Sequence, residues 1–226
     1  MKVMLLAAGR GERMRPLTDA LPKALLEAGG KALVVRLIER LAADGIRDIV
    51  INHAHLGTLI ETALGDGAHL GVRIQYSREG EALETAGGIA KALALLGDAP
   101  FAAVNADLHT DYPFARLQSA LAAGALAHLV LVGNPTHHPG GDFALSDGVV
   151  ANTGPTMLTF SGIGVYRPEL FASIVPGTRA QLATLLRRAA VEGRVTGERY
   201  RGDWRDIGTP ERLATLDAEL RMQTRA

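Results

Sequence analysis

Residues 5–18 read LLAAGRGERMRPLT, and Pro22-Lys23 follows a few positions later. The apolar run 3–8 predicts a buried strand, which breaks into a loop that contains two glycines and three arginines. Glycine lets the backbone bend freely and lets its N–H groups approach a ligand with no Cβ in the way. Successive N–H groups in such a turn bind anions, and Arg and Lys side chains supply the opposite charge to phosphate. The stretch therefore predicts a strand that leads into a polyphosphate-binding loop.

The spacing of residues in this loop differs from that of two familiar nucleotide-binding motifs. Gly9 and Gly11 are followed by Met14, where a dinucleotide-binding turn needs a third glycine. No Gly-Lys-Ser or Gly-Lys-Thr closes a P-loop. Because Gly-x-Gly also occurs in surface loops with ordinary solvated charges, the preceding strand and the clustered cations are what favour phosphate binding here.

The composition indicates a globular protein without a strong overall charge. Of 226 residues, 47% are hydrophobic and 21% are charged, with 24 Lys plus Arg against 24 Asp plus Glu. This balance argues against a general attraction to nucleic acid or membranes, so anion binding must be local. The absence of cysteine excludes disulfides and thiolate chemistry. The first residues resemble neither a signal peptide nor a membrane span, and we expect a cytoplasmic protein.

Strands alternate with helices over the first hundred residues. The predicted strands are 3–8, 48–51, 72–76 and 101–104, and the predicted helices are 31–44, 56–64 and 85–96. This alternation indicates βαβ units, and hence an α/β fold with a Rossmann-like, mostly parallel sheet flanked by helices. Ligands of such sheets bind beyond the carboxyl ends of the strands, where the polar residues of this sequence fall.

The second half of the chain predicts shorter strands after a Gly-, Pro- and His-rich loop at 134–142. Strand candidates at 143–145, 149–150 and 157–166 indicate a small antiparallel insertion beside the main sheet. Thr209 and Pro210 are typical of a helix start, so we expect a last helix from Glu211 to about Met222. No repeat or linker divides the chain, and we expect one domain over residues 1–226.

Two aspartates, Asp107 and Asp206, stand at predicted strand ends. Two carboxylates with phosphate oxygens and water make a Mg²⁺ site, because hard cations prefer oxygen ligands. Either aspartate can instead serve as a cap or turn residue. His137-His138 beside Asp142 suggests zinc only weakly, since no His-x-x-x-His or cysteine partner accompanies it. No Gly-x-Ser-x-Gly elbow supports a hydrolase triad.

Together these stretches resemble the sugar-1-phosphate nucleotidyltransferase family over nearly the whole chain. Residues 6–18 with Pro22-Lys23 are similar to the family's signature loop, and Asn105-Ala106-Asp107 is similar to its metal step. Trp204–Pro210 is similar to the stretch with its second metal carboxylate, and Glu84–Gly88 lies where the family contacts the base. The branch of the family that joins UTP to N-acetylmuramic acid 1-phosphate in cell-wall sugar recycling is the most similar. The stretches that carry this similarity are 51–54, 104–112, 134–143 and 200–210.

The resemblance implies a Mg²⁺-dependent enzyme that takes a nucleoside triphosphate and a sugar 1-phosphate as partners, with no nucleic acid or membrane. It implies a nucleotide-binding part over about 1–110, a sugar-binding part over about 111–226, and a monomer or small homo-oligomer. The implied catalytic residues are Arg13, Lys23 and Asp107, and the implied metal ligands are Asp107 and Asp206. The implied nucleotide contacts are Ala8, Gly9, Gly11, Glu12, Arg13, Lys23, Ser77, Glu84 and Gly87. The implied sugar contacts are Asn105, Asp142 and Asn152.

The sequence departs from the family pattern in two places. Lys23 precedes Ala24, where the family usually has proline. Residues 150–153 contain no lysine, although many relatives hold the sugar phosphate with a Glu-Lys pair at the comparable place. Arg179 or a second metal ion is then the candidate for that role. Because the chain ends soon after Asp206, we expect no C-terminal β-helix with acyltransferase activity.

Three alternatives remain open. The same chemistry can use mannose 1-phosphate with GTP, or glucose 1-phosphate with UTP or dTTP, since base choice rests on a few hydrogen bonds near 77–88. A catalytically silent, nucleotide-sensing regulatory subunit can share the fold. A dehydrogenase is disfavoured, because Asn52-His53 stands where an acidic ribose-binding residue is needed.

Overall fold

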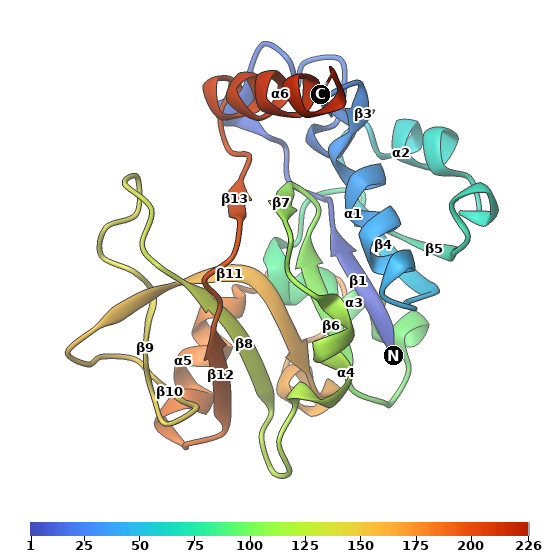
Figure 1. Cartoon of the computed structure of the whole chain (residues 1–226). Helices are drawn as coiled ribbons and strands as arrows, with labels where there is room; N and C mark the ends of the chain where they lie inside the picture. Colours follow the sequence, from blue (N-terminus) through green and yellow to red (C-terminus); the bar gives the residue numbers. More distant parts are fainter. Residues whose placement is uncertain (226) are drawn as a thin grey trace.

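The computed structural model, which describes residues 1–225, is built around a nine-stranded mixed sheet (Figure 1). In their order across the sheet, the strands are β5 (Arg73–Arg78), β4 (Asp48–His53), β1 (Lys2–Leu6), β6 (Phe101–Asn105), β11 (Met157–Tyr166), β8 (Ala127–Val132), β12 (Val195–Arg199), β10 (Val149–Ala151) and β9 (Phe143–Ser146). The strands from β5 to β6 are parallel to one another, which confirms the fold class expected from the first hundred residues.

Helices cover both faces of this sheet. The helices are α1 (Leu33–Ala43), α2 (Gly57–Leu64), α3 (Glu84–Leu96), α4 (Leu117–Ala120), α5 (Leu182–Val191) and α6 (Pro210–Arg225), of which α6 packs outside the main sheet, and short 3-10 turns lie at Glu12–Met14, Lys23–Leu25, Ala68–Leu70, Phe114–Arg116 and Pro168–Phe171. Side chains alternate along a strand, so Val3 and Leu5 of β1 pack with α1 and α2, whereas Met4 packs with α3 and α5. None of the helices that the structure describes is long and apolar enough to cross a lipid bilayer.

The strands between residues 143 and 166 belong to the main sheet. Their expected antiparallel pairing is confirmed, since β10 pairs antiparallel with β9, and β11 pairs antiparallel with β6, β8 and β9. However, β11 lies between β6 and β8 rather than beside the sheet. Nearly all of its residues are buried, and a strand of this kind needs neighbours and covering layers on all sides.

Two short ladders and α6 tie distant segments to the loop that follows β1. Strand β7 (Leu108–Thr110) pairs antiparallel with β13 (Trp204–Asp206), and β2 (Glu27–Ala28) pairs with β3 (Lys31–Ala32). Met14, at the end of the loop, is fully buried with Ile207 and with Leu213 and Leu216 of α6. Figure 1 shows β13 rising beside β7 towards α6. This packing fixes one end of the loop, and β1 fixes the other.

Candidate active site

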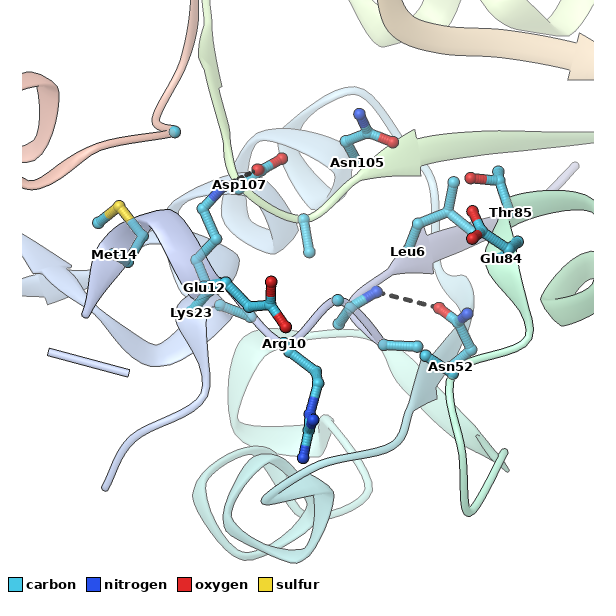
Figure 2. Close-up of a pocket in the computed structure, with 18 of the residues that line it drawn as sticks. Leu6, Arg10, Glu12, Met14, Lys23, Asn52, Glu84, Thr85, Asn105 and Asp107 are labelled. Carbon is cyan, nitrogen blue, oxygen red and sulfur yellow. Dashed lines mark hydrogen bonds and ion pairs between the residues drawn. The ribbon is translucent and has the colours of Figure 1, made fainter. Parts of the chain in front are cut away.

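The loop after β1 lines a cavity of about 690 Å³ at the carboxyl ends of the parallel strands. Leu6 of β1, Asn52 of β4 and Asn105 of β6 all reach it, as expected for a ligand site in an open α/β sheet. The residues from the loop that line it are Ala7, Ala8, Gly9, Arg10, Gly11, Glu12, Arg13 and Met14. Six of the residues that we assigned to nucleotide binding, from Ala8 to Lys23, are therefore gathered here, with Glu84 on the opposite wall (Figure 2).

The backbone of the loop offers several free donors. Within the described chain, the N–H groups of residues 8–11 donate to no other residue. The residue before them, Ala7, donates its N–H to Oδ1 of Asn52 at 3.0 Å, and Nδ2 of this buried Asn52 donates to Oε1 of Glu79 at 2.6 Å. Asn52 thus fixes the start of the loop, as the dashed line in Figure 2 shows. Free N–H groups on a fixed backbone are suited to binding phosphate oxygens.

The two glycines of the loop have different roles. Gly11 has a φ of 65°, and a methyl group on it would lie 2.9 Å from Cγ2 of Thr18, so the fold itself requires glycine there. A methyl group on Gly9 would meet no atom within 4 Å, so the fold itself does not require glycine at this position, which lines the cavity.

This difference predicts opposite results for two alanine variants. Gly11→Ala should lower the free energy of unfolding by about 1–3 kcal/mol, because of the strained φ and the close contact. Gly9→Ala should leave the melting temperature unchanged but raise the KM for the nucleotide, because its methyl group projects into the space of the phosphates. Thermal unfolding and steady-state kinetics measure the two effects separately. A large loss of stability in Gly9→Ala would contradict this division of roles.

Lys23 and Asp107 meet at one side of the cavity. Lys23 Nζ forms an ion pair with Asp107 Oδ2, and the two side chains are only 15% and 26% exposed. Asp107 lies two residues after the end of β6, and the N–H of the intervening Ala106 donates to the carbonyl of Leu6 at 3.1 Å. Figure 2 shows this pair on one wall, Glu84 and Thr85 opposite, and Asn105 between them. An ammonium group held at this place can neutralise charge on a bound phosphate.

The ladder between β7 and β13 brings Asp206 close to Asp107. Asp206 is paired with Leu108, and the N–H of Ile207 donates to the carbonyl of Asp107 at 3.0 Å. Asp206 does not itself line the cavity, but a methyl group on the neighbouring Gly208, which does, would lie 3.1 Å from Asp206 Oδ2 and 3.4 Å from Nη2 of Arg13. The two aspartates and Arg13 therefore converge on one end of the cavity.

The donor set at this end fits a hard divalent cation. Asp107 Oδ1 has no partner among the residues described, whereas Asp206 is bonded through both oxygens, Oδ1 to His137 Nε2 at 3.1 Å and Oδ2 to Arg212 Nη1 at 2.5 Å. Residues 1–225 contain no cluster of three or more His, Asp or Glu side chains placed to hold a metal. Mg²⁺ is commonly held by one or two carboxylates together with substrate phosphates and water, and Asp107 and Asp206 are the carboxylates at this end of the cavity.

A second cavity, of about 320 Å³, adjoins the first. The two cavities share the lining residues Leu6, Glu84, Thr85 and Asn105. Asp142 lines the second one, where its Oδ2 accepts the N–H of Phe160 at 2.8 Å and its Oδ1 pairs with His138. Asn105 and Asp142, two of the three residues assigned to the sugar, thus face one space. Volumes of this order are typical of small-ligand sites.

Three of the residues that we assigned to the nucleotide or the sugar line neither cavity. Ser77 is buried in β5. Gly87 donates its N–H to the carbonyl of Ala180, and the segment 178–180 covers it so closely that a methyl group there would lie 2.2 Å from the carbonyl oxygen of Thr178. Asn152 donates through Nδ2 to the carbonyl of Arg187 at 2.9 Å, and its Oδ1 is buried without a partner. Contact of these residues with substrate remains a prediction.

The structure adds site residues that sequence reasoning missed. Asn52 directly follows the predicted strand 48–51, as Asn105 follows the predicted strand 101–104, so its place beyond a strand end is the signal that could have identified it. Tyr166 and Arg187 line the second cavity, but neither belongs to a sequence motif that could have marked it as a site residue. Arg179, already a candidate partner of the sugar phosphate from the sequence, lines the first cavity and pairs with Glu84 at 3.3 Å, and Glu84 has an unusual φ of 61°. A strained residue between two cavities is typical of ligand sites.

Comparisons with known proteins find relatives along the whole chain. The profile of the family described as nucleotidyl transferase matches residues 2–144. The chain is 52% identical over 225 residues to N-acetylmuramate alpha-1-phosphate uridylyltransferase of Neisseria meningitidis serogroup B, covering 96% of this chain and 97% of that protein. It is 36% identical over 234 residues to the protein of the same name from Caulobacter vibrioides, covering 97% and 96%. A structure from Bacillus anthracis, named as a glucose-1-phosphate thymidylyltransferase, matches with a TM-score of 0.84 and 20% identity over 98% of this chain and 95% of that one, which shows the shared fold.

Proposed function

The chain belongs to the nucleotidyl transferase family and is an enzyme of the sugar-1-phosphate nucleotidyltransferase type, and from this premise we propose that its substrates are UTP and N-acetylmuramic acid 1-phosphate. The products are then UDP-N-acetylmuramic acid and pyrophosphate. Two relatives that carry the corresponding name cover nearly the whole chain, including both cavities. We further propose that the reaction takes place in the cytoplasm and serves the recycling of cell-wall sugars.

The observation that carries this proposal is the continuity of the two cavities. The first has the free N–H groups and cations that a triphosphate needs, and the second has the polar and apolar groups that a sugar needs. Leu6, Thr85 and Asn105 line both, so ligands in the two cavities would meet at this boundary. A reaction that joins a nucleotide to a sugar phosphate requires such a meeting point.

The proposed transfer depends on positioning and charge. The N–H groups of residues 8–11 hold the triphosphate, and Arg13 and Lys23 offset the negative charge that builds up on the leaving group. An oxygen of the sugar phosphate forms a bond to the α-phosphorus, and the bond from this phosphorus to the oxygen bridging to the β-phosphate breaks, so pyrophosphate leaves. Because the sugar phosphate is already an anion, no side chain has to remove a proton.

Asp107 and Asp206 would hold Mg²⁺, which, when bound, neutralises phosphate charge and orients the α-phosphate. Asp107 also forms the ion pair with Lys23, and this contact aims the ammonium group at the same end of the cavity. The chain lacks the lysine that many relatives use for the sugar phosphate, and we assign that role to Arg179, which lines the first cavity.

A panel of substrates tests the proposal. Pyrophosphate release should be on the order of tenfold or more faster with UTP and N-acetylmuramic acid 1-phosphate than with any other pair, because a site built around polar groups rejects ligands that leave them unpaired. Removal of divalent metal by EDTA should stop the reaction, and added Mg²⁺ should restore it. The assay tests each of UTP, GTP and dTTP with each of the 1-phosphates of N-acetylmuramic acid, mannose and glucose.

Two other results would contradict the proposal, one for the substrates and one for the enzyme activity. Faster turnover of mannose 1-phosphate with GTP, or of glucose 1-phosphate with UTP or dTTP, would replace the proposed substrates but keep the chemistry. Calorimetric binding of UTP without turnover of any sugar phosphate would indicate a nucleotide-sensing subunit instead of an enzyme.

A further inference from the structure

The floor of the second cavity contains a polar group that has no partner. Tyr166 is 1% exposed and packs against Phe101 and Phe171, with ring centroids 6.2 and 5.9 Å away. Its side chain runs back along β11, because a methyl group on Gly164 would lie 2.5 Å from the Tyr166 hydroxyl. Gly162, two residues further along this face of the strand, lines the same cavity.

The hydroxyl of Tyr166 forms no hydrogen bond with any residue that the structure describes, although a buried tyrosine hydroxyl usually has a partner. Burial raises the pKa of the Tyr166 phenol, so the group keeps its proton and remains a donor. A methyl group on Gly164 would clash with this hydroxyl, and one on Gly162 would lie 2.5 Å from Nδ2 of Asn105, so the two glycines make room for polar side chains that line the cavity. A ligand in the cavity is therefore the natural acceptor for this hydrogen bond.

A single cation, Arg187, is found among the described residues that line the second cavity, and no carboxylate there pairs with it. It stands on α5 one turn after Ala183, on the helix face that borders the cavity. Its guanidinium carbon lies 5.3 Å from the centroid of the Phe143 ring. Stacking of this kind holds the guanidinium plane in place and leaves its N–H donors available.

The acidic residues of the second cavity form no ion pair with Arg187. Asp142 is bonded to the N–H of Phe160 and to His138. Glu84 pairs with Arg179 on the side of the first cavity. The charge that remains unpaired in the second cavity is therefore positive, and it calls for an anionic group on the ligand.

The phosphate of the sugar 1-phosphate is not the anion that pairs with Arg187. We assigned that phosphate to Arg179, which lines the first cavity only, whereas Arg187 lines the second cavity only. A sugar that reaches both residues must carry a second anion. N-acetylmuramic acid has one, a carboxylate on an ether substituent, while N-acetylglucosamine has a neutral hydroxyl at that position.

We propose that Arg187 binds the carboxylate of the sugar substrate and that Tyr166 donates a hydrogen bond to the same substituent. The two residues together select acidic sugar 1-phosphates over neutral ones. This assignment rests on the proposed function and adds the residues that determine its sugar specificity. Arg187 is exposed, and the buried side chains of Phe143 and Leu186 lie beside it on the wall of the cavity.

Kinetics with two sugar phosphates test the assignment. Arg187→Ala should lower kcat/KM for N-acetylmuramic acid 1-phosphate on the order of 10- to 100-fold, since hydrogen bonds to a charged group are lost. The loss should come mainly from a higher KM, because the carboxylate is remote from the α-phosphorus. With N-acetylglucosamine 1-phosphate, kcat/KM should not change, and Arg187→Lys should give an intermediate value with the acidic sugar.

Arg188→Ala is the matched control. Arg188 is the next residue of α5, pairs with Glu192 at 3.6 Å and lines neither cavity. The Arg188→Ala variant removes the same charge from the same helix, so its kcat/KM for both sugar phosphates should equal that of the wild type. Equal losses on both sugars in Arg187→Ala, or no loss on either, would overturn the role of Arg187 and leave the proposed uridylyl transfer standing. Wild-type protein that turns over neither sugar would overturn the proposed function itself, and the assignment with it.

Tyr166→Phe tests the floor of the cavity separately. It removes one hydroxyl that has no partner in the folded protein, so the melting temperature should not fall. The kcat/KM for the acidic sugar should fall on the order of tenfold, and that for the neutral sugar should not change. A lower melting temperature with equal losses on both sugars would show a structural role for the hydroxyl and would overturn its part of the proposal.

Discussion

Lys23→Ala is expected to lower kcat on the order of 10²- to 10³-fold, because it removes a fixed positive charge where negative charge develops during transfer. The side chain is mostly buried, and its ammonium group is already held by Asp107, so no reorganisation is needed when the substrate arrives. An interaction that strengthens in the transition state affects kcat more than substrate binding. Steady-state pyrophosphate release over a range of UTP concentrations separates the two parameters.

Lys31→Ala is a suitable control for this prediction. Lys31 pairs with Glu39 at 2.7 Å, is 41% exposed and lines neither cavity. The variant loses the same charge from the surface, where ion pairs contribute little, and should keep the wild-type rate. A Lys23→Ala protein with wild-type kcat and a raised KM for UTP would mean that Lys23 only binds the nucleotide and does not stabilise the transition state.

Asp107→Asn is expected to have the second largest effect. The variant keeps the size of the side chain but removes a negative charge, so the proposed Mg²⁺ site loses a ligand and Lys23 loses its partner. We expect kcat to fall on the order of 10²- to 10³-fold, as for other groups that organise charge in an active site. The Mg²⁺ concentration that gives half-maximal activity should rise on the order of tenfold or more.

The metal titration distinguishes the two roles of Asp107. If the aspartate only positions Lys23, the rate falls but the dependence on Mg²⁺ stays as in the wild type. Asp48→Asn is the control, because Asp48 is a half-buried residue that pairs with Arg73 at the opposite ends of the strands, away from both cavities. A purified Asp107→Asn protein with a near-normal rate would remove Asp107 from the proposed mechanism.

Local patterns predicted much of the fold. Turn residues follow the apolar runs close to where the strands end. The parallel pairing of β1 with β4 and β6 is confirmed. The helix start at Thr209 is confirmed as well, since the N–H of Arg212 donates to Oγ1 of Thr209 at 3.4 Å. Such features depend on neighbours in the chain, so they can be read without a structure. The resemblance to the family is also confirmed, because its motifs are contiguous stretches.

The contacts between distant segments could not be predicted in this way. The strand β13 is only three residues long, too short to show a hydrophobic pattern, yet its ladder with β7 is what brings Asp206 to Asp107. Gly87 has the small size that a base contact needs, but the segment 178–180 covers it. His137 reaches Asp206 from a loop whose composition indicates only a turn.

By itself, the sequence determined that a strand and a glycine-rich cationic loop begin the chain and that a parallel sheet supports them. The physical reason is that burial, turn geometry and charge are properties of short stretches. Only the tertiary structure decided which carboxylates meet, which glycines face ligand and which cation faces the second cavity. These depend on β-ladders and packing between residues far apart in the chain, where each contact is specified by shape and burial rather than by a local pattern.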